Sequence, residues 1–467
     1  MANDLKNRSQ LNVDKDLINE IEELIESRSD ALLRNILADL YDYDIAVLID
    51  SLKSDEDAVY LFSLLSQETA GEIILELQDD RRDAILENLS EGKLSNLLVE
   101  MDSDDAADLV ADLDKEEQDK VLKNLDTVGK EDSEEVRELL KYDENSAGGI
   151  MAKEFIVANE NDTVASTIKT IQEKGEDIDQ FYNMWVVDNS NHLKGIISLR
   201  RLIISMKEPD KMIKDVMNPD VISVDANMDQ EEVAKIFMNY DLVSVPVVDT
   251  SDRVIGRITI DDIMDVMEEE YTEDVAKMSG TDAEELERKS AIQIARMRLP
   301  WLMIALGVEM LAVLVIKAHD KILGEIILLA AFMPIINAIS GNSGLQSAAI
   351  VVRALDTGYI TLSNWWAPFS RQIKTNFIIG IVIGILVGII GYLMSDYPSK
   401  MEFGITVAVS MFASINIAGL AGTAIPMLSK KFGFDPAVSS GPFATAFQDV
   451  IGVTIFFTVA SLMLEAI

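Results

Sequence analysis

The segment that decides the fold is Asn376-Phe-Ile-Ile-Gly-Ile-Val-Ile-Gly-Ile-Leu-Val-Gly-Ile-Ile-Gly-Tyr-Leu-Met394, which contains no charged residue. A helix needs about 20 mainly apolar residues to cross the roughly 30 Å of hydrocarbon in a bilayer. Comparable apolar runs lie on both sides of this segment, and all of them follow Pro300. We therefore predict five membrane spans, at residues 299–316, 326–352, 377–394, 404–428 and 438–464.

Basic residues beside the spans predict their orientation. The N-terminus is polar and acidic and carries no recognisable signal peptide, so the part before the spans is expected in the cytoplasm and the C-terminus outside. Cytoplasmic flanks of membrane proteins are enriched in Lys and Arg. Nine such residues lie on the proposed inner side and three on the outer side. The inner residues are Arg288, Lys289, Arg296, Arg298, Arg353, Arg371, Lys374, Lys430 and Lys431.

Charge divides the chain into two chemically different parts near residue 295. The formal net charge is −41, and −40 of it belongs to the first 300 residues. A part with this charge disfavours nucleic acid and anionic lipid surfaces and attracts cations; solubility is the alternative reason for an acidic surface. The chain has no cysteine, two histidines and no phosphate-binding loop. We expect no disulfide, no thiolate metal site and no enzyme activity.

Two of the predicted spans contain polar residues that are costly in hydrocarbon unless they pair or line water. In the fifth span, Gly441, Thr445, Asp449 and Gly452 fall on one face of a helix. These positions either line a cation pathway or provide interhelical hydrogen bonds and close packing. The polar residues of the second span are Asn337, Ser340, Asn342, Ser343, Gln346 and Ser347.

Asp449 is the strongest candidate for contact with a cation. A carboxylate inside a span is usually functional, and no Lys or Arg lies at a matching depth in the sequence. Glu309, in the first span, is a weaker candidate. Oxygen donors suit Mg²⁺, Ca²⁺ or Mn²⁺ better than Zn²⁺ or copper. One deep carboxylate per chain cannot enclose a dehydrated ion, so a hydrated Mg²⁺ held through its waters by Asp449 of two subunits fits best.

An internal repeat occupies part of the first 140 residues. Segments of 12 residues begin at Gln78, Ser90, Asp102 and Asp114, and each places apolar residues three or four apart. This period predicts short helices stacked in a superhelical array. Their exposed faces are rich in acid, namely Asp102, Asp104, Asp105, Asp108, Asp112 and Asp114.

A second repeat covers residues 143–268. Gly149-Ile-Met-Ala-Lys-Glu-Phe parallels Asp215-Val-Met-Asn-Pro-Asp-Val, and Trp185-Val-Val-Asp parallels Val245-Pro-Val-Val-Asp. Each copy predicts strand, helix, strand, turn, strand and helix. The pattern resembles a tandem pair of CBS domains.

CBS pairs often bind adenine nucleotides through a Ser/Thr-x-x-Asp motif after the last strand. The second copy keeps this motif as Thr259 and Asp262, whereas the first has Ser198 followed by Arg201. One nucleotide site is therefore a hypothesis, with ATP as the candidate ligand. The alternative is that Thr259 is an ordinary helix N-cap.

A polar helix over residues 268–298 is predicted to lead from this pair into the membrane, since its acidic start and basic end suit the helix dipole.

The order of helical array, CBS pair, connecting helix and five spans resembles the MgtE family of Mg²⁺ channels. The most specific segments are Asp229-Gln-Glu-Glu-Val-Ala, Asp261-Asp-Ile-Met-Asp-Val-Met-Glu, Gly341-Asn-Ser-Gly-Leu-Gln346 and Asp449-Val-Ile-Gly452.

The expected fold class is a multidomain membrane protein with an α-helical superhelical N-terminal domain, tandem α/β CBS domains, a long connecting helix and a five-helix transmembrane domain. The expected domain bounds are 1–140, 141–208, 209–267, 268–297 and 298–467. The resemblance implies a homodimer in the inner cell membrane with cytoplasmic N-terminal domains. It implies a pore that contains Asp449 and is lined by Asn342, Gln346 and Thr445.

The resemblance also implies regulatory Mg²⁺ sites in the cytoplasmic part. The matching positions are Asp229, Glu231, Asp241, Asp262, Asp265, Glu270, Glu273, Asp274 and Asp435. Ligands in the N-terminal array stay unassigned. Two departures from the family pattern bear on ion selectivity. Leu345 lies where the family often has a second Asn, and Gly441 lies where it often has an amide side chain.

We therefore expect a Mg²⁺ channel or transporter that imports the ion and closes when cytoplasmic Mg²⁺ binds its acidic domains. Without Mg²⁺, facing carboxylates repel and the connecting helices release the pore; bound Mg²⁺ reverses this. One alternative is an ion-coupled secondary transporter of Co²⁺ or Mn²⁺. Another is a membrane-anchored sensor of Mg²⁺ or nucleotide without transport, although an anchor does not need polar residues in its spans.

Overall fold

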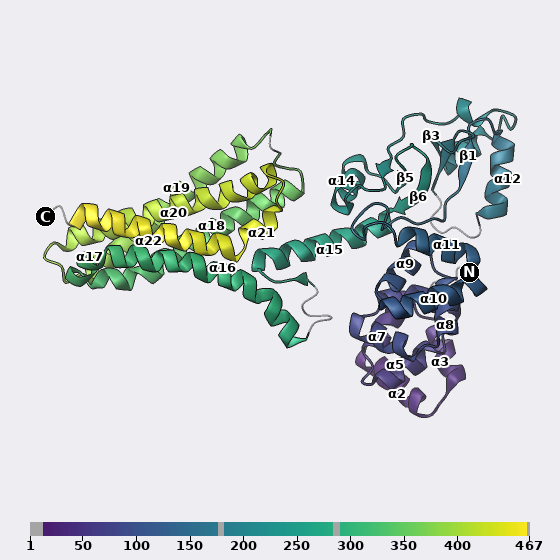
Figure 1. Cartoon of the computed structure of the whole chain (residues 1–467), viewed down its shortest axis with the longest axis horizontal. Helices are drawn as coiled ribbons and strands as arrows, with labels where there is room; N and C mark the ends of the chain where they lie inside the picture. Colours follow the sequence, from purple (N-terminus) through teal and green to yellow (C-terminus); the bar gives the residue numbers. More distant parts are fainter. Residues whose placement is uncertain (1–12, 176–181, 284–289, 362, 465–467) are drawn as a thin grey trace. The chain divides into compact units, whose positions relative to one another are not determined.

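The computed structural model describes residues 13–175, 182–283, 290–361 and 363–464. The chain divides into two compact units, Met1–Glu268 and Glu269–Ile467. Figure 1 shows short helices and two small sheets in the first unit and long, roughly aligned helices in the second.

The first part of unit 1 is an array of short helices, and its repeat is confirmed. Gln78, Ser90, Asp102 and Asp114, the predicted segment starts, are the N-cap residues of four consecutive helices. Asp114 accepts hydrogen bonds from the backbone N–H groups of Glu116 and Glu117, as an N-cap carboxylate should. The helices are α2 (Lys15–Glu26), α3 (Asp30–Leu37), α4 (Asp42–Asp50), α5 (Asp55–Phe62), α6 (Gln67–Glu76), α7 (Asp79–Asn88), α8 (Glu91–Leu98), α9 (Ser103–Ala111), α10 (Lys115–Val128) and α11 (Lys130–Leu139).

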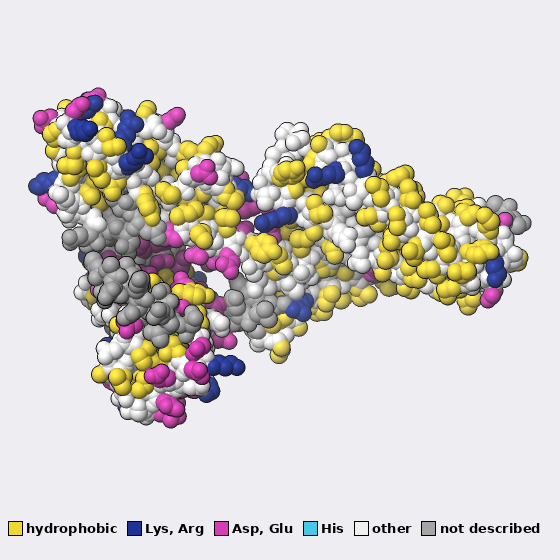
Figure 2. Space-filling model, turned by 180° about the vertical axis from the view of Figure 1, so that it is seen from behind, with side chains coloured by type: hydrophobic (Ala, Val, Ile, Leu, Met, Phe, Trp, Pro, Cys, Tyr) yellow, Lys and Arg dark blue, Asp and Glu magenta, His cyan; other side chains and the backbone are white. Residues whose placement is uncertain are grey.

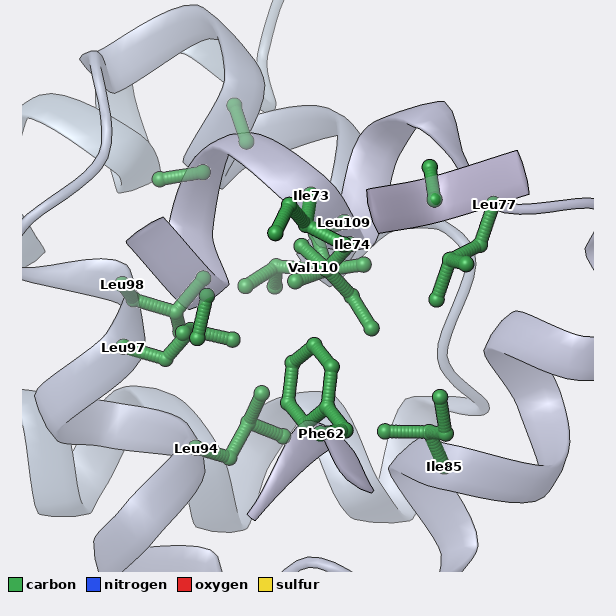
Figure 3. Packing of buried hydrophobic residues seen from close by; sticks show 14 of the residues in the cluster. Phe62, Ile73, Ile74, Leu77, Ile85, Leu94, Leu97, Leu98, Leu109 and Val110 are labelled. Atoms are coloured by element: carbon green, nitrogen blue, oxygen red, sulfur yellow. The ribbon is translucent and has the colours of Figure 1, made fainter. Parts of the chain in front are cut away.

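Apolar side chains from successive helices hold this array together. Phe62 of α5 lies among Ile73, Ile85 and Leu94 from the next three helices (Figure 3). Burying a side chain of this size contributes about 1.5–3 kcal/mol. Because each helix is too short to be stable alone, the contacts between neighbours stabilise the array.

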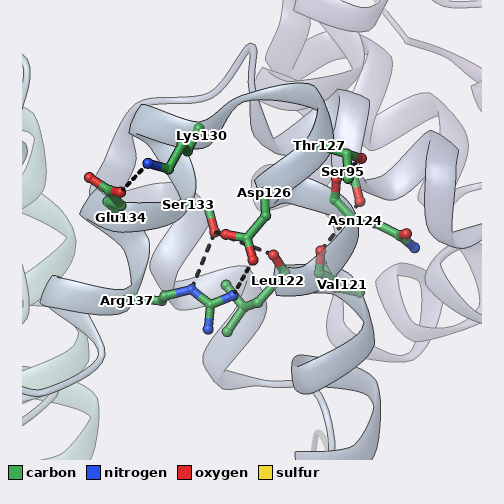
Figure 4. A network of polar contacts seen from close by, with 10 residues as sticks. All are labelled: Ser95, Val121, Leu122, Asn124, Asp126, Thr127, Lys130, Ser133, Glu134 and Arg137. Atoms are coloured by element: carbon green, nitrogen blue, oxygen red, sulfur yellow. Dashed lines mark hydrogen bonds and ion pairs between the residues drawn. The ribbon is translucent and has the colours of Figure 1, made fainter.

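A polar network joins α10 to α11 at the end of the array. Ser133 Oγ donates to Asp126 Oδ1 at 2.7 Å, and Arg137 pairs with the other oxygen of Asp126 at 3.1 Å (Figure 4). Lys130 and Glu134 form a further pair on the exposed side of α11. The network links the two helices, and α11 precedes the first repeat of the α/β part.

The α/β part contains two copies of the same three-stranded sheet, which confirms the second repeat. In each copy the first two strands are parallel and the last two antiparallel. The register shifts at equivalent places, Val186/Val187 and Val247/Val248. The first copy has β1 (Val157–Asn159), α12 (Val164–Lys174), β2 (Asn183–Val187), β3 (Leu193–Ser198) and α13 (Leu199–Ser205); the second has β4 (Val224–Asp225), α14 (Gln230–Tyr240), β5 (Ser244–Val248), β6 (Val254–Thr259) and α15 (Ile260–Ser279).

Unit 2 contains the five predicted spans, each as a helix long and apolar enough to cross a membrane. Hydrophobic side chains cover the flank of this bundle (Figure 2), as expected for a surface that contacts lipid. The helices are α16 (Ala291–Ala318), α17 (Asp320–Glu325), α18 (Leu328–Asp356), α19 (Trp366–Met394), α20 (Lys400–Lys431), α21 (Pro436–Ser440) and α22 (Pro442–Leu464).

The prediction of one continuous connecting helix is wrong. The polar helix expected over residues 268–298 ends at Ser279, because Gly280 adopts a left-handed conformation with φ of 73° and terminates it. A separate helix, α16, begins after its N-cap Ser290. Arg288 and Lys289, counted among the inner flanks, lie outside the described residues. The fifth span is confirmed as Pro436–Leu464, and within it α21 ends at Ser440 and α22 begins at Pro442.

Candidate functional site

The polar residues of α18 divide between two faces of the helix. Ser343 and Ser347 are buried and bond to Asn376 of α19, at 3.1 and 3.2 Å. Asn342 and Gln346 are exposed on another face. Interhelical hydrogen bonding, one of the two alternatives, therefore explains the serines. It does not explain the exposed amides, which remain candidates for a pathway.

Asp449 lies where α22 packs against a glycine of α18. A Cβ added to Gly341 would lie 3.5 Å from Asp449 Oδ1. One residue earlier on α22, the Gln448 side chain is 1 % exposed and lies against Gly344, where a Cβ would collide with its amide. Both amide atoms of Gln448 lack a partner among the described residues. The glycines of the Gly341-Asn-Ser-Gly344 motif thus make room for two consecutive polar side chains of α22.

The single polar face predicted for the fifth span is wrong in part. Gly441 lies outside α22, because it caps α21 and the helix restarts at Pro442. Thr445 is exposed and Asp449 half-buried, as a pathway face requires. Gly452 is instead buried, and a Cβ there would lie 3.1 Å from Asn337 Oδ1 and Ser340 Oγ of α18. It serves close helix packing.

The Glu309 side chain of α16 reaches Asp449. It is half-buried, and the two side-chain carboxyl groups are within hydrogen-bonding reach of each other. Glu309, the weaker sequence candidate, therefore faces α22.

Unit 1 holds a group of carboxylates that we call the acid cluster: Asp102, Asp104 and Asp105 at the start of α9, Glu154 before β1, and Asp262 of α15. Carboxylate oxygens of Asp102, Asp104 and Glu154 lie within 4.8 Å of one another. Two oxygens bound to one Mg²⁺ at about 2.1 Å are separated by at most about 4.2 Å, and oxygens around Ca²⁺ by slightly more. The three carboxylates fit one hard divalent cation with little movement.

Electrostatics at the acid cluster favour a bound positive charge. Burial, followed by the carboxylates of Asp105 and Asp262, raises the pKa of Asp104 well above its usual value. Burial and the neighbouring Asp102 and Asp262 raise the pKa of Asp105 to about 8. Arg257 Nη2 approaches Asp102 at 3.4 Å, but it does not offset these shifts. Near neutral pH the cluster therefore holds protons or a cation.

The two candidate nucleotide residues bond to each other. Thr259 donates from its N–H and from Oγ1 to Asp262 Oδ2, both at 2.8 Å. Thr259 is 5 % exposed. Because Asp262 also lies beside Asp104 and Asp105, its carboxylate belongs to the acid cluster in this arrangement.

At the end of α15, Lys277 lies between two of the predicted regulatory carboxylates. Its Nζ donates to Glu273 Oε1 at 2.6 Å and to Asp435 Oδ2 at 3.0 Å. Although burial lowers the pKa of Lys277, these two bonds outweigh it and raise the pKa above its usual value. We call Glu273, Lys277 and Asp435 the lysine junction. It joins the end of α15 to the start of α21.

The structure does not gather the other predicted regulatory residues into one site. Asp229 caps α14 and accepts from the Glu231 N–H at 2.9 Å, and Glu231 pairs with Lys235. Asp241, with φ of 51°, ends the same helix. Partial burial and the carboxylate of Glu76 raise the pKa of Asp265. The remaining positions, Glu270 and Asp274, lie on α15 between Asp265 and Lys277.

Sequence reasoning missed two residues of these sites. Glu154 accepts from Ser103 N–H at 3.1 Å and Ser103 Oγ at 2.9 Å, and it completes the acid cluster from a position 51 residues away. The only sequence signal was a Lys-Glu pair inside the first repeat. Lys277 was also missed, although its i,i+4 spacing from Glu273 predicts a helix ion pair.

Comparison with known families covers most of the chain. A model described as a divalent cation transporter, MgtE, matches residues 333–459, and the MgtE intracellular N domain matches residues 40–145. The CBS domain model matches twice, at residues 147–208 and 213–269. The two CBS matches agree with the two three-stranded sheets.

Individual relatives give the same result. The chain is 36 % identical over 335 residues to a magnesium transporter MgtE of Enterococcus faecalis, covering 72 % of this chain and 73 % of the relative. It is 33 % identical over 338 residues to a magnesium transporter MgtE of Thermus thermophilus, covering 71 % and 73 %. A crystal structure titled as the cytosolic domain of the Mg²⁺ channel MgtE in complex with ATP matches with a TM-score of 0.50 and 30 % identity, over 53 % of this chain and 99 % of that one.

Proposed function

This chain belongs to the MgtE family of divalent cation transporters, and we propose that it imports Mg²⁺ across the inner cell membrane and is closed by cytoplasmic Mg²⁺. The observation that carries the proposal is the position of Asp449. Its carboxylate, on α22, packs against Gly341 of α18 within the five-helix bundle. A membrane carboxylate is normally retained for function.

The exposed amides support a homodimer. Asn342 and Gln346 lie one helical turn apart on the surface of α18, and Thr445 is exposed on α22. Polar side chains that face hydrocarbon are costly, so a second copy of the chain is the cover that we propose. Its symmetric approach would bring two Asp449 carboxylates to one axis. Between them a hydrated Mg²⁺ would pass, held through its waters.

The acid cluster is the regulatory site that we propose. Asp104 is buried among carboxylates, and the oxygens of Asp102, Asp104 and Glu154 fit one divalent cation. Mg²⁺ bound there would cancel repulsion between α9, the segment before β1 and the start of α15. The helix α15 belongs to both units. Mg²⁺ binding would therefore act on the pathway by changing the position of α15.

ATP binding is proposed from the relative with ATP in its cytosolic domain. The sequence candidates are Thr259 and Asp262. Because these residues bond to each other and Asp262 joins the acid cluster, ATP and the regulatory cation would compete for Asp262. Titration of ATP binding against Mg²⁺ would detect this competition.

The test of the function is Mg²⁺ uptake into proteoliposomes that contain the full chain. We expect wild type to take up Mg²⁺ down its gradient and Asp449→Asn to lose at least 90 % of that flux, because removing the carboxylate removes the charge that attracts the ion. Equal flux through wild type and Asp449→Asn would contradict the proposal. Asp396→Asn, outside the helices, is the matched control and should transport normally.

A further inference from the structure

The contact between Glu309 and Asp449 brings a second carboxylate to the proposed pathway. We propose that Glu309 of α16 is a second cation-binding and selectivity-determining residue of that pathway, acting on the divalent ion together with Asp449. The inference rests on the proposed function, since it assumes that the cation passes Asp449. The two nevertheless fail separately in the test below.

The position of Glu309 within its span favours this role. Between Leu299 and Ile316, Glu309 is the only charged residue. Most of the side chains around it are exposed to the surroundings of the bundle, whereas Ala312 is buried on the inner side. Glu309 lies on that inner side and reaches α22. An intramembrane carboxylate directed at a second one is costly unless a positive charge accompanies the pair.

Among the described residues of the bundle, no basic side chain forms an ion pair with either carboxylate. Arg298, on the same helix, is 11 residues before Glu309, which is about 16 Å along the helix axis. His319 lies at the far end of α16, where its ring stacks on Phe457. A cation from outside the chain is therefore the natural third member of the group.

The chemistry of the pair suits a hydrated divalent ion. Each protomer places two carboxylates beside the pathway, and oxygen ligands are those that Mg²⁺ prefers. A divalent ion compensates more of this negative charge than a monovalent ion does. The pair therefore favours divalent over monovalent cations, and Leu345 and Gly441, where the family tends to place amides, do not need to supply that preference.

The test compares Glu309→Gln, Glu309→Asp, Asp449→Asn and Glu325→Gln in proteoliposomes of the full chain, with Mg²⁺ and Na⁺ as the transported ions. We expect Glu309→Gln to raise the Mg²⁺ concentration for half-maximal uptake roughly tenfold. That is the effect of removing one negative charge about 6 Å from a divalent ion in water-like surroundings. The preference for Mg²⁺ over Na⁺ should fall, and Glu309→Asp should restore part of both. Glu325→Gln, an exposed carboxylate of α17, should match wild type.

Several results would overturn the inference. If Glu309→Gln had normal half-saturation and normal preference while Asp449→Asn lost uptake, Glu309 would not bind the cation and the proposed function would stand. If Asp449→Asn transported normally, the proposed function itself would fail. If wild-type uptake required a Na⁺ or proton gradient and Glu309→Gln removed that requirement, Glu309 would bind a coupling ion instead. A packing role would lower the thermal stability of both Glu309 variants without changing the Mg²⁺-to-Na⁺ ratio.

Discussion

The acid cluster and the lysine junction are both acidic sites on or beside α15, but they solve the problem of repulsion differently. In the acid cluster, Asp104 is surrounded by carboxylates and its pKa is raised well above the usual value. In the lysine junction, two carboxylates share the ammonium of Lys277 at 2.6 and 3.0 Å. The acid cluster is proposed to bind a cation from solution. In the lysine junction, the positive charge is supplied by the Lys277 side chain.

This difference indicates which site depends on Mg²⁺. We expect the acid cluster to gain stability from added cation, because ionising its carboxylates without one is costly. At the lysine junction, Lys277 stays charged at physiological pH and offsets one of the two negative charges. The regulatory positions taken from the family resemblance are therefore not equivalent here. Glu273 and Asp435 are proposed to act without metal, and Asp262 is proposed to act with it.

The largest expected effect comes from removing the acid cluster. In the double variant Asp104→Asn with Glu154→Gln, Mg²⁺ should no longer protect the amides of α9 from hydrogen exchange. In wild type, Mg²⁺ at about 100 times its dissociation constant should add about 2.7 kcal/mol of protection, a factor of about 100 in exchange rate. Asp119→Asn, an exposed carboxylate of α10, is the control. Equal Mg²⁺ protection in the double variant would remove the distinction between the two sites.

The next effect is a pH dependence of the acid cluster alone. Burial and neighbouring carboxylates raise the pKa of Asp104 well above its usual value and that of Asp105 to about 8. Unfolded chains release these protons near pH 4, so the folded state binds more protons between about pH 4 and pH 8. Without Mg²⁺, protection of α9 should therefore fall as pH rises from 5 to 7, by up to about 1.4 kcal/mol per pH unit for each proton.

Two comparisons would check the cause of this pH dependence. Saturating Mg²⁺ should flatten it, because the bound cation replaces the protons. The amides of α21 at the lysine junction should show no such change, since Lys277 stays protonated throughout this range. A pH dependence of equal size at α21 would contradict the contrast between the sites.

Removing the attached cation should convert the lysine junction into a site that needs metal. Without Mg²⁺, Lys277→Met should lower the protection of α21 by about 1–2 kcal/mol, between the values for exposed and buried ion pairs. Added Mg²⁺ should restore it. The control is Lys235→Met, which removes the lysine of another i,i+4 ion pair, the one with Glu231 on α14. If wild type also needed Mg²⁺ for protection of α21, the account of the junction would be wrong.

The smallest expected effect concerns close packing beside the junction. A Cβ on Gly441 would lie 2.9 Å from the backbone oxygen of Lys277, which is shorter than ordinary contact. Gly441→Asn, which introduces the amide typical of the family, should lower the protection of α21 by about 1 kcal/mol. Gly324→Asn introduces the same side chain into open space and should have a smaller effect. Equal loss in both variants would show that packing on Lys277 is not the cause.

Much of the fold followed from local sequence patterns. The N-cap residues Gln78, Ser90, Asp102 and Asp114 were predicted because caps and apolar spacing are properties of neighbouring residues. The five spans were predicted for the same reason. The break at Gly280 was missed. The acidic and basic ends of the predicted connecting helix indicated one continuous helix, although Gly280, directly after Ser279, is a residue that commonly ends helices.

The sites were less predictable, because they depend on residues distant in sequence. Glu154 meets Ser103 from 51 residues away, and nothing in either segment identifies the other. Asp435 and Lys277 come from different helices, as do Glu309 and Asp449. The sequence named Asp449 from its depth in a span, but only packing shows that Gly341 receives it and that a second carboxylate lies beside it.

The most direct test of the account is Mg²⁺ flux through reconstituted full-length protein, recorded while Mg²⁺ is raised on the side of the N-terminal domains. Wild type should close as Mg²⁺ rises. The Asp104→Asn, Glu154→Gln double variant should stay open over the same range, with unitary flux unchanged because Asp449 is intact. Closure of the double variant at the wild-type Mg²⁺ concentration would contradict the account.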